Sequence, residues 1–178
     1  LKIHFAVRRA HQLFSARNIL ASIAISILAN NAIAQTAGRI LDLRPGGSFE
    51  TMVESLQAGD TLIVHAGTYA DSGRLSITAR GTSTAPIVIR GATGEARPLI
   101  TRPSTAALQN TINIEGAAYL TIKGLEIVGN GGDGVNLNSF PTFITLEDLK
   151  IHDVDVGINF RSSMNNIIVR RNEIYRTG

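Results

Sequence analysis

From residue 61 onward, short apolar runs alternate with glycine, asparagine and aspartate. The runs are rich in Ile, Val, Leu and Thr, which favour β-strands, and the residues between them are those that form turns. No helical periodicity of useful length occurs in this part of the chain. The pattern therefore predicts a series of short strands.

The strand pattern repeats at a nearly constant interval. One segment recurs at 121–127, 145–151 and 168–174. A second, independent segment recurs with the same spacing at 112–114, 135–137 and 158–160. Three short strands per repeat of about 23 residues are typical of a β-solenoid, in which each strand pairs with its counterpart about 4.8 Å away in the next coil. The frame of a leucine-rich repeat is missing, and a propeller blade needs about 40 to 45 residues.

Charged residues support the same stacking of coils. At this interval two outward columns alternate in sign: Lys123, Glu147 and Arg170, then Glu126, Lys150 and Glu173. Opposite charges that face each other on neighbouring strands contribute about 0.2 to 1 kcal/mol. We interpret these six residues as a solvated structural ladder.

Residues 48–56 depart from the strand pattern. Their apolar positions lie on one helical face, at Phe49, Met52, Val53 and Leu56. Ser48 is placed to be the N-cap, and the helix is expected to end near Gly59. Because the open end of a solenoid exposes its core and its strand edges, we predict that this short helix caps the first coil.

The segment 1–34 has the composition of a secretory signal peptide. Four basic residues come before or at the start of an apolar run at 19–29: Lys2, Arg8, Arg9 and Arg17. Residues 32–34 provide a small-x-small cleavage site ending at Ala34. The run is shorter than the roughly 20 residues needed to cross a bilayer. We therefore expect cleavage and export to the periplasm or beyond, with no stable membrane anchor.

Removing this segment changes the charge and the organisation of the chain. The whole sequence has 17 Lys plus Arg and 14 Asp plus Glu, and residues 1–34 hold four of the bases and no acid, which leaves 13 against 14. The remaining chain is thus close to neutral, and its charge does not indicate nucleic-acid binding. The absence of cysteine excludes a disulfide framework. We expect a signal peptide at 1–34, an N-terminal segment with the capping helix at 35–60, and coils at 61–178 that continue beyond this fragment.

Alternation along the strands places a row of polar side chains on the outer surface. Six residues share this row, two per coil: Asn113, Glu115, Asn136, Asn138, Asn159 and Arg161. Amide and guanidinium groups in a row suit sugar hydroxyls and carboxylates. The row is therefore the candidate polysaccharide-binding groove. The alternative is that stacked asparagines only hydrogen-bond along the surface of the sheet.

Other candidate chemistry is sparse. Three aspartates border the same strands and could bind calcium, although turns favour Asp beside Gly equally well: Asp133, Asp153 and Asp155. His65 and His152 each stand in a strand-like context with no evident paired carboxylate, so we interpret both as structural. The glycine-rich stretch 129–134 lacks the helix and the Lys-Ser/Thr pair of a phosphate loop. No serine-hydrolase or His-Glu-x-x-His motif occurs.

The segment 59–69, GDTLIVHAGTY, resembles the opening of many secreted right-handed parallel β-helix proteins when it follows such a helix. These include chondroitinase B-like and alginate-lyase-like polysaccharide lyases of the pectate-lyase-like superfamily. Segments 85–91 and 119–125 resemble the next landmarks of that group, and the resemblance extends over residues 48–178. It implies an all-β, right-handed parallel β-helix. For the lyases it also implies β-elimination at an acidic sugar, with a base removing the C5 proton while calcium, Arg or Lys neutralises the adjacent carboxylate.

Two functions follow from this resemblance. The first is a secreted polysaccharide lyase, monomeric when complete, whose catalytic residues lie in coils beyond Gly178. The second is a non-catalytic glycan-binding, adhesin or periplasmic accessory protein, because the coils present hold no recognisable catalytic cluster. A related hydrolase would need clustered aspartates on the outer face.

Overall fold

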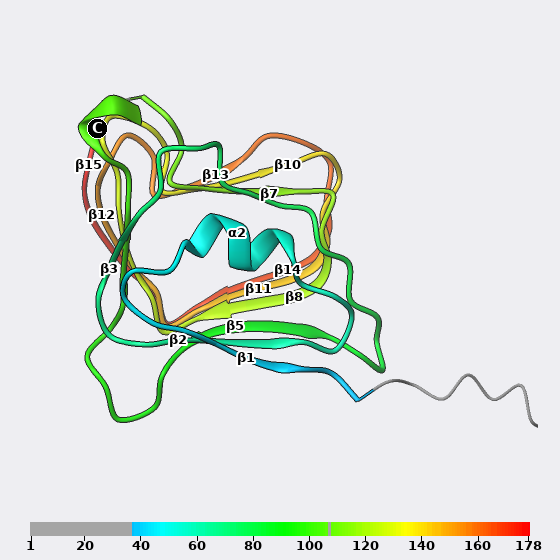
Figure 1. The fold of residues 1–178 in the computed structure, drawn as a ribbon. Helices are drawn as coiled ribbons and strands as arrows, with labels where there is room; N and C mark the ends of the chain where they lie inside the picture. The colour runs from blue at the N-terminus through cyan, green and yellow to red at the C-terminus, as the bar shows by residue number, and fades with distance from the viewer. Residues whose placement is uncertain (1–36, 107) are drawn as a thin grey trace, which may run out of the picture. The chain divides into compact units, whose positions relative to one another are not determined.

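Three parallel β-sheets form the sides of a solenoid whose coils lie on top of one another (Figure 1). The structure, a computed structural model, describes residues 37–106 and 108–178, so the expected signal peptide at 1–34 lies outside the described residues. Strands of successive coils are neighbours in each sheet, and the largest sheet has six strands. The expected all-β parallel β-helix is confirmed.

The sheets are named here by their strands. Sheet A contains β1 (Ile40–Leu43), β2 (Thr61–Val64), β5 (Ile87–Gly91), β8 (Ala118–Lys123), β11 (Thr142–Glu147) and β14 (Asn165–Arg170). Sheet B contains β3 (Thr68–Ala70), β6 (Leu99–Thr101), β9 (Glu126–Val128), β12 (Lys150–Val154) and β15 (Glu173–Thr177). Sheet C contains β4 (Ser76–Ile77), β7 (Ile112–Glu115), β10 (Val135–Asn138) and β13 (Ile158–Phe160). The helical elements are α2 (Phe49–Glu54) and the 3-10 turn η1 (Ser104–Ala106).

Strand register confirms the repeat interval in the later coils. In sheet C, Asn113 pairs with Asn136, and Asn136 pairs with Asn159, so the two steps are equal. In sheet A, Thr145 pairs with Thr121 on one side and with Ile168 on the other, as the sequence repeat predicts. Residues about two dozen positions apart are therefore neighbours in space.

Earlier coils are longer than the repeat predicts. Thr61 pairs with Val88, and Val88 pairs with Thr121. The number of residues between paired positions is larger in both cases than in the later coils. The additional length between Val88 and Thr121 lies in two loops, at 92–98 between β5 and β6 and at 102–111 between β6 and β7, and the step from Thr61 to Val88 contains the loop 78–86 between β4 and β5. The stacking is kept because these loops lie outside the strands.

The two charged columns occupy the expected register, but they form only some of the expected pairs. Arg170 lies 2.7 Å from Glu147, and Lys150 lies 3.2 Å from Glu126. Within the described residues, neither Lys123 nor Glu173 forms an ion pair. The ladder is therefore incomplete at Lys123, which faces a like charge on its other neighbour, Arg90.

The solenoid interior is filled by the apolar residues that alternate with these outward positions. Ile112, Ile114 and Leu120 are fully buried. Ile158 packs against this core as expected, whereas the Phe160 side chain is 52% exposed. Phe160 belongs to the last strand of sheet C, which has a paired strand on one side only.

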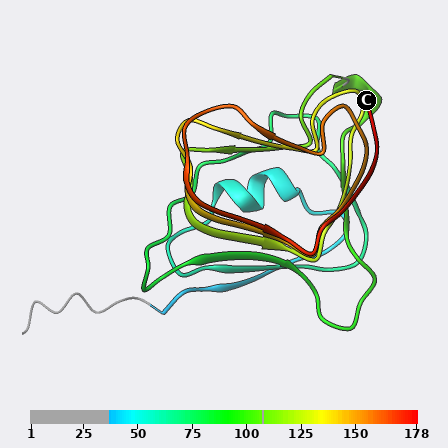
Figure 2. The same ribbon diagram turned by 180° about the vertical axis from the view of Figure 1, so that it is seen from behind.

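Helix α2 covers one end of the core, as the apolar pattern predicts. It lies across the ring outlined by the coils, and the view from the opposite end shows the last coil framing the same ring (Figures 1 and 2). Ser48 caps the helix by accepting a hydrogen bond from the Thr51 backbone at 3.0 Å. Phe49 and Val53 are fully buried. They shield the first coil from water.

The start of the solenoid differs from the expectation in two respects. The helix ends at Glu54, with Ser55 as its C-cap, and Gln57 then donates its backbone NH to Asp60 at 2.7 Å in a turn that precedes β2. Strand β1, which the sequence pattern did not reveal, pairs with β2 and begins sheet A before the helix. No helix in the described part of the chain is long and apolar enough to span a membrane.

Candidate functional site

The predicted asparagine row is formed, but its amides are not open to solvent. Asn113 and Asn136 are each 3% exposed, although both project from sheet C away from the apolar core. Asn113 donates to the Leu75 carbonyl at 3.1 Å and accepts from Asn110 at 2.8 Å. Asn113 and Asn136 thus lie on the outward side of sheet C, as predicted, but their amides are buried there. Sugar contact along this row stays a prediction.

The residue three positions before each asparagine explains this burial. Asn110 covers Asn113 from the loop before β7, and Asp133 occupies the corresponding position before β10. Asp133 accepts from Asn136 at 3.0 Å and from Asn159 in the next coil at 2.8 Å. Because buried polar groups must be paired, this network holds the turns against the sheet.

The other three residues of the row, Glu115, Asn138 and Arg161, differ from the buried asparagines in their contacts and exposure. Glu115 is bound by both terminal nitrogens of Arg74, at 2.5 and 2.8 Å, and this guanidinium lowers the pKa of the Glu115 carboxyl below its ordinary value. Asn138 accepts from the neighbouring Ser139 backbone at 2.8 Å. Arg161 is exposed and forms no ion pair within the described residues. Arg161 is thus the exposed member of the row, whereas Glu115, Asn138 and Asn159 are half-buried.

The three aspartates proposed as calcium ligands do not gather into one site. Asp133 is engaged by the asparagines, and Asp153 is engaged by Arg176 and His152. Asp155 is exposed on the loop after β12. Among residues 37–106 and 108–178, no group of three or more His, Asp or Glu side chains could hold a metal ion.

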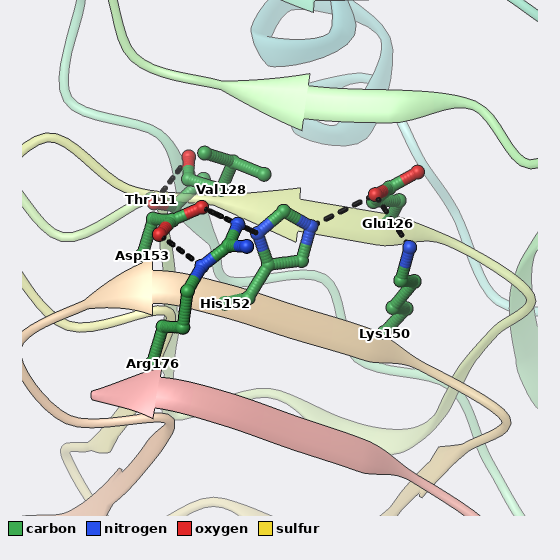
Figure 3. Close-up of polar contacts among 7 residues, drawn as sticks. All are labelled: Thr111, Glu126, Val128, Lys150, His152, Asp153 and Arg176. Atoms are coloured by element: carbon green, nitrogen blue, oxygen red, sulfur yellow. Dashed lines mark hydrogen bonds and ion pairs between the residues drawn. The ribbon is translucent and has the colours of Figure 1, made fainter.

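A polar cluster on the outward face of sheet B contains more ionisable side chains than the asparagine row (Figure 3). His152, on β12, lies between two carboxylates: its Nε2 is 2.8 Å from Glu126 and its Nδ1 is 2.7 Å from Asp153. Lys150, on the same strand, is 3.2 Å from Glu126. Arg176, on β15, binds Asp153 through its Nε at 2.6 Å. Because Ile151 points into the core, Lys150 and His152 are both turned outward.

Tyr175 completes this cluster from the next coil. Its ring stacks on His152 with 4.7 Å between centroids and an angle of 16° between planes. The Lys150 ammonium and the Arg176 guanidinium lie 5.8 and 5.0 Å from the ring centroid. A phenol, an ammonium, a guanidinium and an imidazole therefore share one face of sheet B. We call these residues, with Glu126 and Asp153, the His152 cluster.

Charge pairing shifts several pKa values in the His152 cluster. Arg176, and then His152, lower the pKa of Asp153 to about 2. His152, and then Lys150, lower the pKa of Glu126. Tyr175, and then Glu126, raise the pKa of Lys150. Lys150 thus stays cationic, and both acids stay anionic, over the neutral range.

Two solved structures have an architecture similar to that of this chain. The chain is similar to an alginate lyase from Paenibacillus sp. str. FPU-7, with a TM-score of 0.64 and 23% identity over 75% of this chain and 44% of that one. It is also similar to a GH136 lacto-N-biosidase from Eubacterium ramulus, with a TM-score of 0.62 and 18% identity over 90% of this chain and 37% of that one. The chain shares their β-helix fold.

The β-helix spans less than half the length of either of these solved structures. No protein-family model matches it, and no curated protein matches it. At identities below one quarter, the likeness describes the fold, and function has to be argued from the site.

Sequence reasoning missed the carboxylate partners of both histidines. His65 lies 2.8 Å from Asp42 and 2.7 Å from Glu95, and these two carboxylates raise its pKa, Asp42 more strongly. The interpretation that His65 and His152 lack a paired carboxylate is therefore wrong. For His152 a signal was present in the sequence. The repeat interval places Lys150 beside Glu126, and His152 lies two residues after Lys150 on the same face of the strand, so Glu126 was also a possible partner of His152. For His65 it was absent, because β1, which carries Asp42, had not been recognised.

Proposed function

We propose that the chain belongs to a secreted carbohydrate-active protein that acts on an acidic polysaccharide by β-elimination. The observation that carries this proposal is the His152 cluster on sheet B, where Lys150, Tyr175 and Arg176 lie together on the outer surface. The β-helix fold, which the chain shares with an alginate lyase, agrees with it.

The chemistry of β-elimination matches these side chains. The reaction removes the proton beside a sugar carboxylate, so the carboxylate must be neutralised and a proton acceptor must lie nearby. Arg176 and Lys150 supply positive charge for the carboxylate. Tyr175 supplies a hydroxyl that can transfer a proton. His152, whose ring nitrogens contact Glu126 and Asp153, supports the Tyr175 ring by stacking on it. Glu126 and Asp153 hold the cations and the imidazole in place.

Tyr175→Phe tests this assignment most directly, because the change removes one hydroxyl and keeps the ring that stacks on His152. We expect the intact protein to release unsaturated, ultraviolet-absorbing products from alginate, pectate or chondroitin. Tyr175→Phe should lower this rate by about a hundredfold or more, the usual contribution of an acid–base group. Tyr119→Phe is the matched control, because Tyr119 stacks on Phe143 in another sheet. If no unsaturated product is released from any of the three polymers, with or without calcium, the lyase assignment is wrong.

A non-catalytic glycan-binding role is the second candidate. It is favoured by the internal pairing of the His152 cluster, in which Lys150 and Arg176 already contact carboxylates. In that case the protein should bind acidic oligosaccharides without releasing unsaturated products. Tyr175→Phe should then leave the affinity for those oligosaccharides nearly unchanged, because the stacked ring is retained.

Secretion is part of the same proposal and has a separate test. The apolar run at 19–29 and the small residues at 32–34 favour cleavage after Ala34. Expression of the full gene in a host with the general export pathway should give an exported protein whose first residue is Gln35. Retention of residues 1–34 on the exported protein would contradict this part of the proposal.

A further inference from the structure

A concavity of about 490 Å³ lies at the corner where strands of sheet A lead into sheet B. The loop 92–98, one of the loops that lengthen the early coils, forms one wall. Lys123 and Glu147, at the ends of β8 and β11, line the side formed by sheet A. The volume lies within the roughly 300 to 1,000 Å³ that is usual for small-ligand pockets.

The walls of this concavity are held by contacts that join different coils. Glu95 in the loop accepts from the Ala66 backbone at 2.9 Å and contacts His65 at 2.7 Å. Arg97, near the end of the loop, reaches Asp148 at 3.0 Å, two coils further along the solenoid. The loop is thus fixed at two points. Little ordering of the loop is required when a ligand binds, which favours affinity.

All three acidic residues that line the concavity are already engaged. Glu95 is held by His65, and Asp148 by Arg97. Glu147 is shared by Arg170, at 2.7 Å, and by Arg171. Glu147 faces Lys123 in register, but in the described residues none of the three acids forms an ion pair with Arg90 or Lys123.

Two cations in the concavity lack an acidic partner. Arg90 and Lys123 are directly paired across β5 and β8, so two positive charges face each other on neighbouring strands. Like charges in this arrangement are destabilising. Arg90 donates to its neighbours, the Gly91 carbonyl and the Thr93 hydroxyl, at 3.1 and 3.3 Å. In the part of the chain that the structure describes, neither Arg90 nor Lys123 forms an ion pair.

We propose that this concavity binds a uronate residue of an acidic polysaccharide, with the sugar carboxylate between Arg90 and Lys123. A carboxylate would relieve the repulsion between the two cations, and Arg can hold it through two parallel hydrogen bonds. Glu147 and Asp148 can accept hydrogen bonds from sugar hydroxyls, which favours a hydroxylated acid over a phosphate or a sulfate ester. The choice of ligand class rests on the proposed function. The site itself is distinct from the His152 cluster and needs no catalysis.

Calorimetric titration of the protein with short oligogalacturonates or oligoguluronates tests this proposal. Arg90→Gln and Lys123→Gln should each weaken binding by about tenfold, the effect of losing one charge-assisted hydrogen bond, and the double variant should show no measurable binding. Arg80→Gln is the matched control, because it removes an exposed positive charge outside the concavity. It should bind within about twofold of the unchanged protein, given the weak effect of distant screened charges. Circular dichroism checks that each variant is folded.

Titrations with chemically altered oligosaccharides distinguish the possible outcomes. The same oligomers with their carboxylates reduced to alcohols should not bind, and sulfated oligosaccharides should bind more weakly than the uronates. Equal binding by the double variant, by reduced oligomers or preferentially by sulfated oligomers would overturn the site. Binding that depends on Arg90 and Lys123, in an intact protein that releases no unsaturated product, would support the site and overturn the lyase assignment.

Discussion

The Nε2 atom of His152 lies 2.8 Å from the Oε1 atom of Glu126, a residue of the neighbouring strand in the preceding coil. The same carboxylate also contacts Lys150 at 3.2 Å. One acid thereby holds two side chains of the adjacent coil, both of which project from the outward face of sheet B. This contact joins the structural ladder to the candidate site.

Glu126→Gln should destabilise the protein by about 1 kcal/mol. The substitution removes the charge of the carboxylate, but the amide oxygen can still accept a hydrogen bond, so only part of the contribution of a charged hydrogen bond is lost. Glu173→Gln is the matched control, because Glu173 occupies the same column but forms no ion pair within the described residues. Urea unfolding at neutral pH measures both. Because the folded-state pKa of Glu126 is lowered, its contribution is present above the ordinary carboxyl pKa and is lost as the pH falls through the lowered value. Equal effects of the two substitutions would show that the contacts to His152 and Lys150 add nothing.

Asn136→Ala should cost about 1 to 3 kcal/mol, because Asp133 loses one of its two amide donors in a buried position. Asn138→Ala, two residues later on the same strand, removes a local contact to Ser139 and should change stability by less than about 0.5 kcal/mol. Thermal unfolding of both variants measures the difference. If Asn136→Ala were as stable as Asn138→Ala, the buried asparagine row would not be structural.

His65 should make the protein's stability depend on pH. Asp42 and Glu95 raise its folded-state pKa, and desolvation, followed by the charge of Arg44, opposes them. The stabilisation from His65 is therefore fully present below the unfolded-state pKa, about 6.5, and is lost as the pH rises through the higher folded-state value. The difference in melting temperature between the unchanged protein and His65→Gln should shrink over that interval. NMR titration of the imidazole of His65, with Glu95→Gln as a comparison, should show a lower pKa in the variant.

Asp60→Asn should destabilise the start of the solenoid by about 2 kcal/mol at neutral pH, the value of a pKa shift of this size. Asp60 is buried and accepts from Arg39 and from the Gln57 backbone, and the bond from Arg39 is the main cause that lowers its pKa to about 2. Its contribution is present above the ordinary pKa and declines as the pH falls towards 2. Asp155→Asn is the control, because Asp155 is exposed and its side chain forms no ion pair in the described residues. Urea unfolding between pH 7 and pH 3 should show the difference in stability between the two variants becoming smaller as the pH falls, without disappearing by pH 3.

Much of the fold follows from repetition in the sequence. The second segment of the repeat predicted the register of sheet C because Asn113, Asn136 and Asn159 are each flanked by apolar residues at the same interval. The helix at the N-terminal end could also be predicted from the sequence, because Phe49 and Val53 lie on one helical face and follow the N-cap residue Ser48. Strand β1 was not, because it is one short segment that belongs to no repeated pattern.

The candidate site was less predictable, because side chains meet across coils and around turns. The row through Asn113 and Asn136 was placed on the outside of the sheet, yet both amides are buried beneath the turns that carry Asn110 and Asp133. Strand alternation specifies which side of the sheet a residue is on. It does not specify what folds over that side.

The sequence alone determined the stacking of coils, the inward apolar columns and the capping helix. These features depend on periodicity, which is a property of the chain itself. The tertiary structure decided which charges form ion pairs. It enclosed His152 between Glu126 and Asp153, and it placed Arg90 beside Lys123 with no ion pair to either cation in the described residues. The physical reason is that an ion pair requires contact within a few ångströms, and that distance is set by loops such as 92–98, whose paths no repeat encodes.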